Sequence, residues 1–245
     1  IGKNFRNEGV SFKHNPEFTM MECYQAYADY TTMMTLVEEM FAACALAAIG
    51  TLKFTYQGNE IDLTPPWKRL SIRDAIMQET KIDIFQSPDL QSLRARIGEM
   101  NLKVEPHPSW GKTVDELFSA FAEPKLIQPT FVMDHPEEIS PFAKRKPNAE
   151  GIVERFEPYI GGFEVGNAFT ELNDPVDQYE RFLAQAQQRA AGDVEAHPID
   201  LDFIQAMMHG MPPTGGLGIG VDRMVMLFTD QPSIRDVILF PQLRT

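Results

Sequence analysis

The chain has 245 residues, of which 43% are hydrophobic, and a formal net charge of −13 at pH 7. This length allows one sizeable hydrophobic core, and the acidic balance argues against a broad nucleic-acid-binding face, since phosphate contacts need Lys and Arg. The two cysteines, Cys23 and Cys44, make no disulfide framework. Together with thirteen methionines they indicate a reducing, cytoplasmic protein.

The first segment predicts a β-hairpin whose strands separate their side chains by face. Arg6 and Glu8 fall on one face of the first strand. One face of the second strand carries an alternating set: Phe18, Met20, Glu22 and Tyr24. A face with a cation, carboxylates and rings suits a charged ligand, because burying these charges without partners is costly. A solvated face with ordinary cross-strand ion pairs fits the same spacing.

The next segments predict one long helix and a second hairpin. Residues 31–48 predict a buried helix ended by Gly50. Its apolar run, residues 40–49, is half the length of a bilayer span, so we expect a core helix and no membrane association. Residues 53–56 and 60–63 flank a turn and predict the hairpin.

The middle of the chain predicts helices with no obvious catalytic chemistry. Ser71 is expected to cap a helix with Asp74 at its third position. Residues 88–100 predict another helix, and Thr113 with Glu116 predicts a capping box that opens a third. We interpret residues 77–123, approximately, as a helical insertion within a single catalytic domain that covers residues 1–245.

The remaining segments indicate the fold class. Residues 127–132 predict a buried strand, and residues 174–191 predict an amphipathic helix that begins at Asp174-Pro175. Sheet hairpins alternate with helices and give few parallel βαβ signals. The sequence therefore predicts an α+β fold with a mainly antiparallel β-sheet flanked by helices.

A glycine pair at 161–162 predicts a further hairpin with two carboxylates on one face. A two-residue turn there pairs Tyr159 with Glu164, and Glu157 then lies one diagonal step from Glu164. Glu171 is seven residues after Glu164, so a straight strand would place it on the opposite face. We therefore expect a bulge or bend near Gly166 if both side chains serve one site.

Three separated motifs carry a resemblance to a known family. Residues 5–8 read Phe-Arg-Asn-Glu, and residues 14–22 read His-Asn-Pro-Glu-Phe-Thr-Met-Met-Glu. Residues 161–174 and 215–224 contain the Gly-Gly-Phe-Glu and Gly-Gly-Leu-Gly-Ile-Gly-Val-Asp-Arg runs. In this order they resemble motif 2, the amino-acid pocket segment and motif 3 of class II lysyl-tRNA synthetases. Residues 234–241 resemble the end of that family.

The resemblance implies an ATP site. It makes Arg6 the main electrophilic group, contacting the α-phosphate and the amino acid's carboxylate, and places adenine between Phe18 and Arg223. Arg6 and Arg223 are the implied catalytic residues. The implied ATP-binding set is Arg6, Glu8, His14, Asn15, Phe18, Glu157, Gly220 and Arg223.

The resemblance also implies a metal site and a lysine pocket. Glu157 and Glu164 would hold Mg²⁺, which prefers one or two protein carboxylates together with phosphate oxygens and water. The side-chain ammonium of lysine needs anionic partners and hydrogen-bond acceptors. The implied lysine-binding residues are Glu22, Tyr24, Asn167 and Glu171.

These expectations define a function and its rivals. The family activates L-lysine with MgATP and transfers it to the 3′ end of tRNA(Lys), acting as a cytoplasmic homodimer. No motif 1 or amino-terminal anticodon-binding domain precedes residue 1, so we expect a catalytic-core fragment of reduced activity. One rival is the related lysyl-transferase acting on elongation factor P, although Gly218 fits the tRNA enzyme better. The other rival is a non-catalytic module that binds lysine or ATP. Such a module would be expected to have lost Arg6 or Arg223, and the sequence keeps both.

Overall fold

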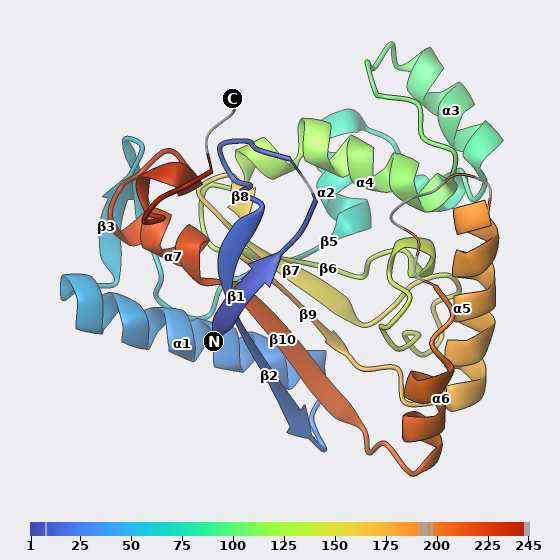
Figure 1. Cartoon of the computed structure of the whole chain (residues 1–245). Coiled ribbons are helices and arrows are strands. Elements are labelled where there is room, and N and C mark those ends of the chain that lie inside the picture. Colours follow the sequence, from blue (N-terminus) through green and yellow to red (C-terminus); the bar gives the residue numbers. More distant parts are fainter. Residues whose placement is uncertain (8, 191, 193–195, 197, 243–245) are drawn as a thin grey trace.

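The computed structural model describes residues 1–7, 9–190, 192, 196 and 198–242. They form one large sheet with helices on both faces (Figure 1). The strands are β1 Gly2–Phe5, β2 Glu17–Ala26, β3 Lys53–Tyr56, β4 Asn59–Asp62, β5 Lys68–Ser71, β6 Thr130–Met133, β7 Arg155–Ile160, β8 Phe163–Glu164, β9 Gly166–Thr170 and β10 Thr214–Gly220. The α-helices are α1 Tyr30–Ile49, α2 Ile72–Thr80, α3 Leu90–Glu99, α4 Trp110–Phe121, α5 Pro175–Ala190, α6 Leu201–Met208 and α7 Val221–Phe228.

The large sheet confirms the predicted fold class. Its strand order is β1-β2-β10-β9-β7-β6-β5, and β8 pairs with β7. Every pairing in it is antiparallel except that of β5 with β6. The strand β10, near the end of the chain, lies between β2 and β9, so the first and third motifs become neighbours.

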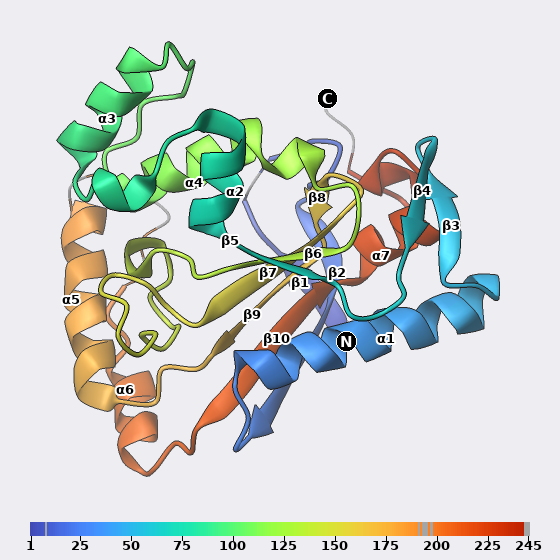
Figure 2. The same cartoon turned by 180° about the vertical axis from the view of Figure 1, so that it is seen from behind.

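One face of the sheet is covered by α1, α7 and the β3–β4 hairpin, as Figure 2 shows for α1. Met33, Val37 and Phe41 of α1 are fully buried there, and Asp29 and Gly50 cap the helix ends. Among the described residues, α1 is the helix that is long and apolar enough to cross a membrane, with a hydropathy of 1.5. The side of α1 that faces the sheet is buried, as predicted for a core helix, whereas Leu46 of the predicted apolar run is 54% exposed.

The other face is covered only in part, by α2, α3 and α4. These helices share a second hydrophobic core with residues of β5, β6 and β7, including Leu70, Val132 and Tyr159. The predicted cap at Ser71 is confirmed, since its Oγ accepts a hydrogen bond from the Asp74 N–H at 3.0 Å. The part of this face over β2, β10 and β9 stays open and forms the site described below.

Two local predictions were wrong. The helix α4 begins at Trp110 with Ser109 as its cap, so Thr113 lies inside the helix, where its hydroxyl bonds to the Ser109 carbonyl at 2.8 Å. The strand β1 ends at Phe5, so Arg6 is outside it. The Arg6 N–H still donates to the Pro16 carbonyl at 2.9 Å, which keeps Arg6 beside the start of β2.

The predicted irregularity near Gly166 is confirmed by the strand register. Tyr159 of β7 pairs with Glu164 of β8, and Phe156 of β7 pairs with Ala168 of β9. Between these pairs, β7 has residues 157–158 and the other segment has residues 165–167. One extra residue on one strand is a β-bulge, which shifts the alternation of faces by one.

Candidate functional site

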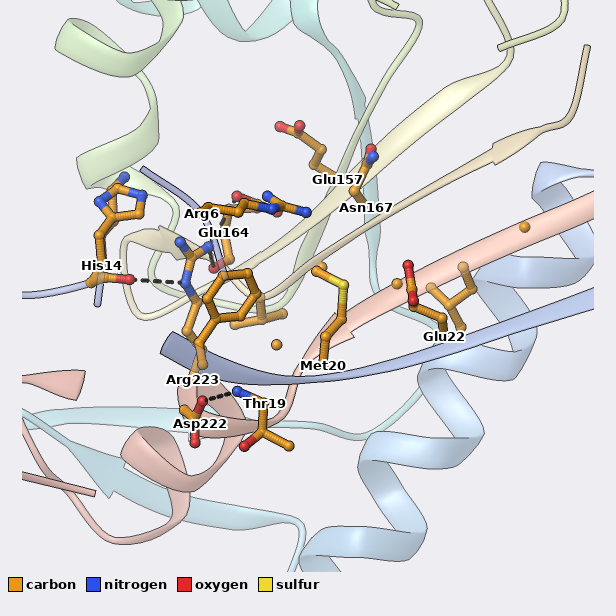
Figure 3. A pocket seen from close by; sticks show the side chains of 18 of the residues that line it. Arg6, His14, Thr19, Met20, Glu22, Glu157, Glu164, Asn167, Asp222 and Arg223 are labelled. Atoms are coloured by element: carbon orange, nitrogen blue, oxygen red, sulfur yellow. Dashed lines mark hydrogen bonds and ion pairs between the residues drawn. The ribbon is translucent and has the colours of Figure 1, made fainter. Parts of the chain in front are cut away.

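A single cavity of about 680 Å³ collects the residues singled out from the sequence. It lies on the open face of the sheet, over β2, β10 and β9. All the described candidates line it: Arg6, His14, Asn15, Phe18, Glu22, Tyr24, Glu157, Glu164, Asn167, Glu171, Gly220 and Arg223. Glu8 lies outside the described residues. Figure 3 shows Arg6, Glu157, Glu164 and Arg223 near one another, with Glu22 farther along the strand.

The alternation of β2 delivers its side chains to this cavity as predicted. Phe18, Met20, Glu22 and Tyr24 all line it, while Cys23 packs with the opposite core. The cation over the Phe18 ring is Arg6, whose Cζ lies 5.2 Å from the ring centre. The resemblance implies that adenine lies between Phe18 and Arg223. In this structure Arg6 lies over one face of the Phe18 ring.

Arg223 connects α7 to two other segments of the site. Its Nη1 donates to both the carboxylate of Glu164, at 3.0 Å, and the Glu164 carbonyl, at 2.8 Å. Its Nε donates to the Lys13 carbonyl at 3.3 Å. Lys13 itself pairs with Glu123, just beyond α4. The loop that carries His14 is thus held from both sides.

Hydrogen bonds hold the side chains of two polar residues of that loop in place. His14 Nδ1 lies 2.8 Å from the Ser11 hydroxyl. Asn15 is buried, and its Nδ2 donates to the Glu17 carbonyl at 2.6 Å. Among the described residues nothing bonds to Asn15 Oδ1, which is a buried acceptor at the cavity wall. Such an atom is costly to bury alone and is suited to a ligand donor.

Glu157 and Glu164 lie close enough for each to affect the other's ionisation. Burial and the charge of Glu157 raise the pKa of Glu164 despite the nearby Arg223. Burial acts the same way on Glu157, but Arg155, His135 and the Tyr159 hydroxyl outweigh it and lower the pKa of Glu157. Two carboxylates that repel each other at a cavity wall would gain from a shared divalent cation. The donor set fits Mg²⁺ held with phosphate oxygens.

Arg155, which the sequence analysis did not single out, holds this part of the site together. Its guanidinium donates to Glu157 Oε1 at 2.6 Å and to Asn167 Oδ1 at 2.9 Å. It also donates to the Ser140 hydroxyl at 2.8 Å. The signal was present in the sequence, because Arg155 precedes Glu157 by two residues and shares its face of the strand.

Asp222 was part of a quoted motif but had no predicted role. It is buried, and its carboxylate accepts a hydrogen bond from the Thr19 N–H at 2.5 Å (Figure 3). This bond joins the first turn of α7 to the strand β2. The bond holds Phe18 of β2 and Arg223 of α7 at a fixed separation. Local sequence patterns do not predict it, because its two residues lie on distant segments.

At the other end of the cavity, Glu171 lies beside Tyr24. The β-bulge brings Glu171, together with Asn167 and Phe169, to the same face as Glu164, and the Glu171 N–H bonds to the Thr214 carbonyl at 2.8 Å. Burial raises the pKa of Glu171 to about 8. The pKa of Tyr24 is raised as well, by burial and then by Glu171 and Glu22. These three groups therefore lie within electrostatic reach of one another.

Comparison with known proteins identifies the family. The model of the class II tRNA synthetases (D, K and N) matches residues 1–244. The chain belongs to this family. Curated relatives named lysine–tRNA ligase share 61% identity in Chloroflexus aurantiacus, 60% in a Roseiflexus species and 54% in Thermotoga maritima. The matches cover 98–100% of this chain and 47–50% of those proteins, so the chain spans about half the length of the curated relatives it matches.

The resemblance predicted from the motifs is therefore confirmed at the level of the family. In this synthetase domain the strand β2, the hairpin β7–β8 with β9, and β10 with α7 correspond to the three quoted motifs. They lie far apart in the sequence, come together in the sheet (Figure 1) and line one cavity. The roles of the individual residues are proposals, developed next.

Proposed function

We propose that this chain is the part of a lysine–tRNA ligase that binds ATP and lysine. The ligase forms lysyl-adenylate and then transfers lysine to tRNA(Lys). The observation that supports this most is one cavity with two chemically different parts. One part has the guanidinium groups of Arg6 and Arg223 (Figure 3), and the other has the carboxylates of Glu22 and Glu171, which both raise the pKa of Tyr24. A triphosphate suits the first part, and a cationic side chain suits the second.

The phosphate part suits the joining of two anions. In adenylate formation a carboxylate oxygen attacks the α-phosphorus, and the bond to pyrophosphate breaks. Arg6 is proposed to bind both reacting groups, because a planar guanidinium can donate to a carboxylate and a phosphate together. Its place over Phe18 and beside the start of β2 supports this role, because the α-phosphate follows directly on the nucleoside whose base Phe18 is proposed to stack. His14 and Asn15 are proposed to contact the phosphates and the nucleoside.

Mg²⁺ is proposed at Glu157 and Glu164, where it would neutralise charge on the triphosphate when ATP is bound. Hydrogen bonds within the chain position both carboxylates. Arg155 and the Tyr159 hydroxyl hold Glu157 at 2.6 and 2.7 Å, and Arg223 holds Glu164. These bonds keep both carboxylates facing the cavity and limit the rearrangement that binding requires.

The acidic part is proposed to select lysine. Glu22 and Glu171 would pair with the side-chain ammonium, and the Tyr24 hydroxyl would accept one of its hydrogen bonds. Asn167, held by Arg155, would orient the substrate. An acidic pocket repels aspartate and is left unpaired by asparagine, which disfavours those two substrates of the family. Transfer to tRNA(Lys), a homodimer and a cytoplasmic location are proposed by analogy with the family alone.

Lysine-dependent exchange of pyrophosphate into ATP tests this proposal in the full natural protein that contains the chain. Glu22→Gln or Glu171→Gln is expected to lower kcat/KM for lysine at least about tenfold, because loss of one charged partner costs about 1.5–3 kcal/mol. Exchange driven by aspartate or asparagine, or unchanged lysine activation in both variants, would contradict the pocket assignment.

A further inference from the structure

The third residue of β10, Gly216, is the glycine of the described cavity wall at which an added side chain would meet a carboxylate. A Cβ atom built at Gly216 would lie 1.8 Å from Glu171 Oε1 and 2.9 Å from Glu171 Cδ. Cβ atoms essentially never approach another heavy atom within 3.0 Å. The carboxylate of Glu171 therefore occupies the space that a side chain at residue 216 would take.

The backbone of Gly216 does not require glycine. The residue lies inside the regular strand β10, pairs with Tyr24 on one side and Phe169 on the other, and has no positive φ. Gly218 and Gly220 line the same cavity, but their added Cβ atoms would make only ordinary contacts, at 3.6 Å from Met20 and 3.5 Å from Arg223. At residue 216 the missing side chain is thus explained by Glu171.

The backbone of Glu171 is held in place, so the end of its flexible side chain is the part that would give way. Its N–H is bonded to the Thr214 carbonyl, and its backbone bridges to Ala143. The Tyr24 ring closes the other side, with its Cε1 3.1 Å from the added Cβ. A methyl group at residue 216 would have to displace the carboxylate by about 1.6 Å to restore an ordinary 3.4 Å contact.

We propose that Gly216 is a specificity-determining position, because the absent side chain seats the Glu171 carboxylate where it meets the ammonium group of the substrate. This inference rests on the proposed function for its substrate. It adds that selectivity for a cationic amino acid depends on a residue that makes no side-chain contact of its own. Any larger residue at 216 weakens lysine recognition without touching the ATP-binding part.

Gly216→Ala tests this in the full natural protein. The KM for lysine in the exchange assay is expected to rise at least about tenfold, which corresponds to about 1.4 kcal/mol, while the KM for ATP changes less than about twofold. Gly215→Ala is the matched control. Its Cβ would press on Asp29 and Met33 on the opposite face, so it is expected to lower Tm and leave the lysine KM as it was.

A double-mutant cycle separates this mechanism from a general distortion of β10. In a Glu171→Ala background, Gly216→Ala is expected to have almost no further effect on the lysine KM, because nothing remains to displace. A tenfold rise that persists in that background would overturn the proposal, and so would a lysine KM that Gly216→Ala leaves unchanged. If the single variant does not fold, the double variant is expected to fold.

A crystal structure of the Gly216→Ala variant gives a result that does not depend on substrate. The Glu171 carboxylate is expected to move away from residue 216, and a carboxylate in its original place would overturn the proposal. If the carboxylate moves but neither the parent nor the Glu171→Gln variant activates lysine, the assigned substrate is wrong. The steric role of Gly216 would then stand on its own.

Discussion

At the scale of the residue, Glu171 links the chemistry of the site to the stability of the chain. Burial raises its pKa to about 8 in the folded, ligand-free chain from an ordinary value of 4.5. Between these two pH values the folded state holds a proton that the unfolded state has lost. The contribution of Glu171 to the free energy of unfolding therefore falls as pH rises from about 4.5 to about 8.

Glu171→Gln removes this dependence. At pH 8.5 the ligand-free variant is expected to be more stable than the parent by about 1–3 kcal/mol, and near pH 4.5 the two are expected to be equal. Thermal unfolding followed by circular dichroism at both pH values measures the difference. A constant difference in Tm across this range would mean that the Glu171 carboxyl titrates normally in the folded chain.

At the scale of the element, the start of α4 shows which of two candidate residues caps the helix. Thr113-x-x-Glu116 and Ser109-x-x-Lys112 both begin with a capping residue, and the structure uses Ser109, whose Oγ accepts from the Lys112 N–H at 3.2 Å. The earlier start allows Trp110 to pack against the partly buried edge of the second core and to donate its indole N–H to the Ser87 carbonyl at 2.7 Å.

Ser109→Ala is expected to cost about 1 kcal/mol of unfolding free energy, the usual value of an N-cap hydroxyl. Ser119→Ala in the same helix is the matched control, and it is expected to be neutral or slightly stabilising because alanine favours a helix interior. Chemical denaturation of both variants measures this. Equal losses would show that the hydroxyl of Ser109 does not act as a cap.

At the scale of the whole molecule, the helices predicted as an insertion depend on the sheet for their core. Phe118 of α4 is 1% exposed and packs edge-on against Tyr159 of β7, with ring centres 5.2 Å apart. Leu70 and Val132 of the sheet belong to the same buried cluster. These contacts predict that residues 77–123 and the sheet unfold together rather than as two units.

Phe118→Ala is therefore expected to lower the unfolding free energy of the whole chain by about 3–5 kcal/mol in one transition. Phe85→Ala, in the same helical segment but with a ring that is 49% exposed, is the control and is expected to cost less than about 1 kcal/mol. Two separate transitions, with only one of them shifted by Phe118→Ala, would show that the helical segment is an independent unit.

The sequence by itself determined the elements that depend on neighbouring residues. Alternation along β2 put Phe18, Glu22 and Tyr24 on one face, because successive side chains of a strand point to opposite sides. Gly161 and Gly162 fixed the turn that pairs Tyr159 with Glu164, since both have the positive φ that such turns require. Motif order was enough to predict the family.

Tertiary structure decided what depends on distant segments. Arg6 rather than Arg223 lies over Phe18, Arg155 joins Glu157 to Asn167, and Glu171 fills the space above Gly216. Each of these contacts depends on the shape and charge of residues from other strands. Local periodicity and capping carry no information about such contacts, because they arise only when the sheet brings β2, β7, β9 and β10 together.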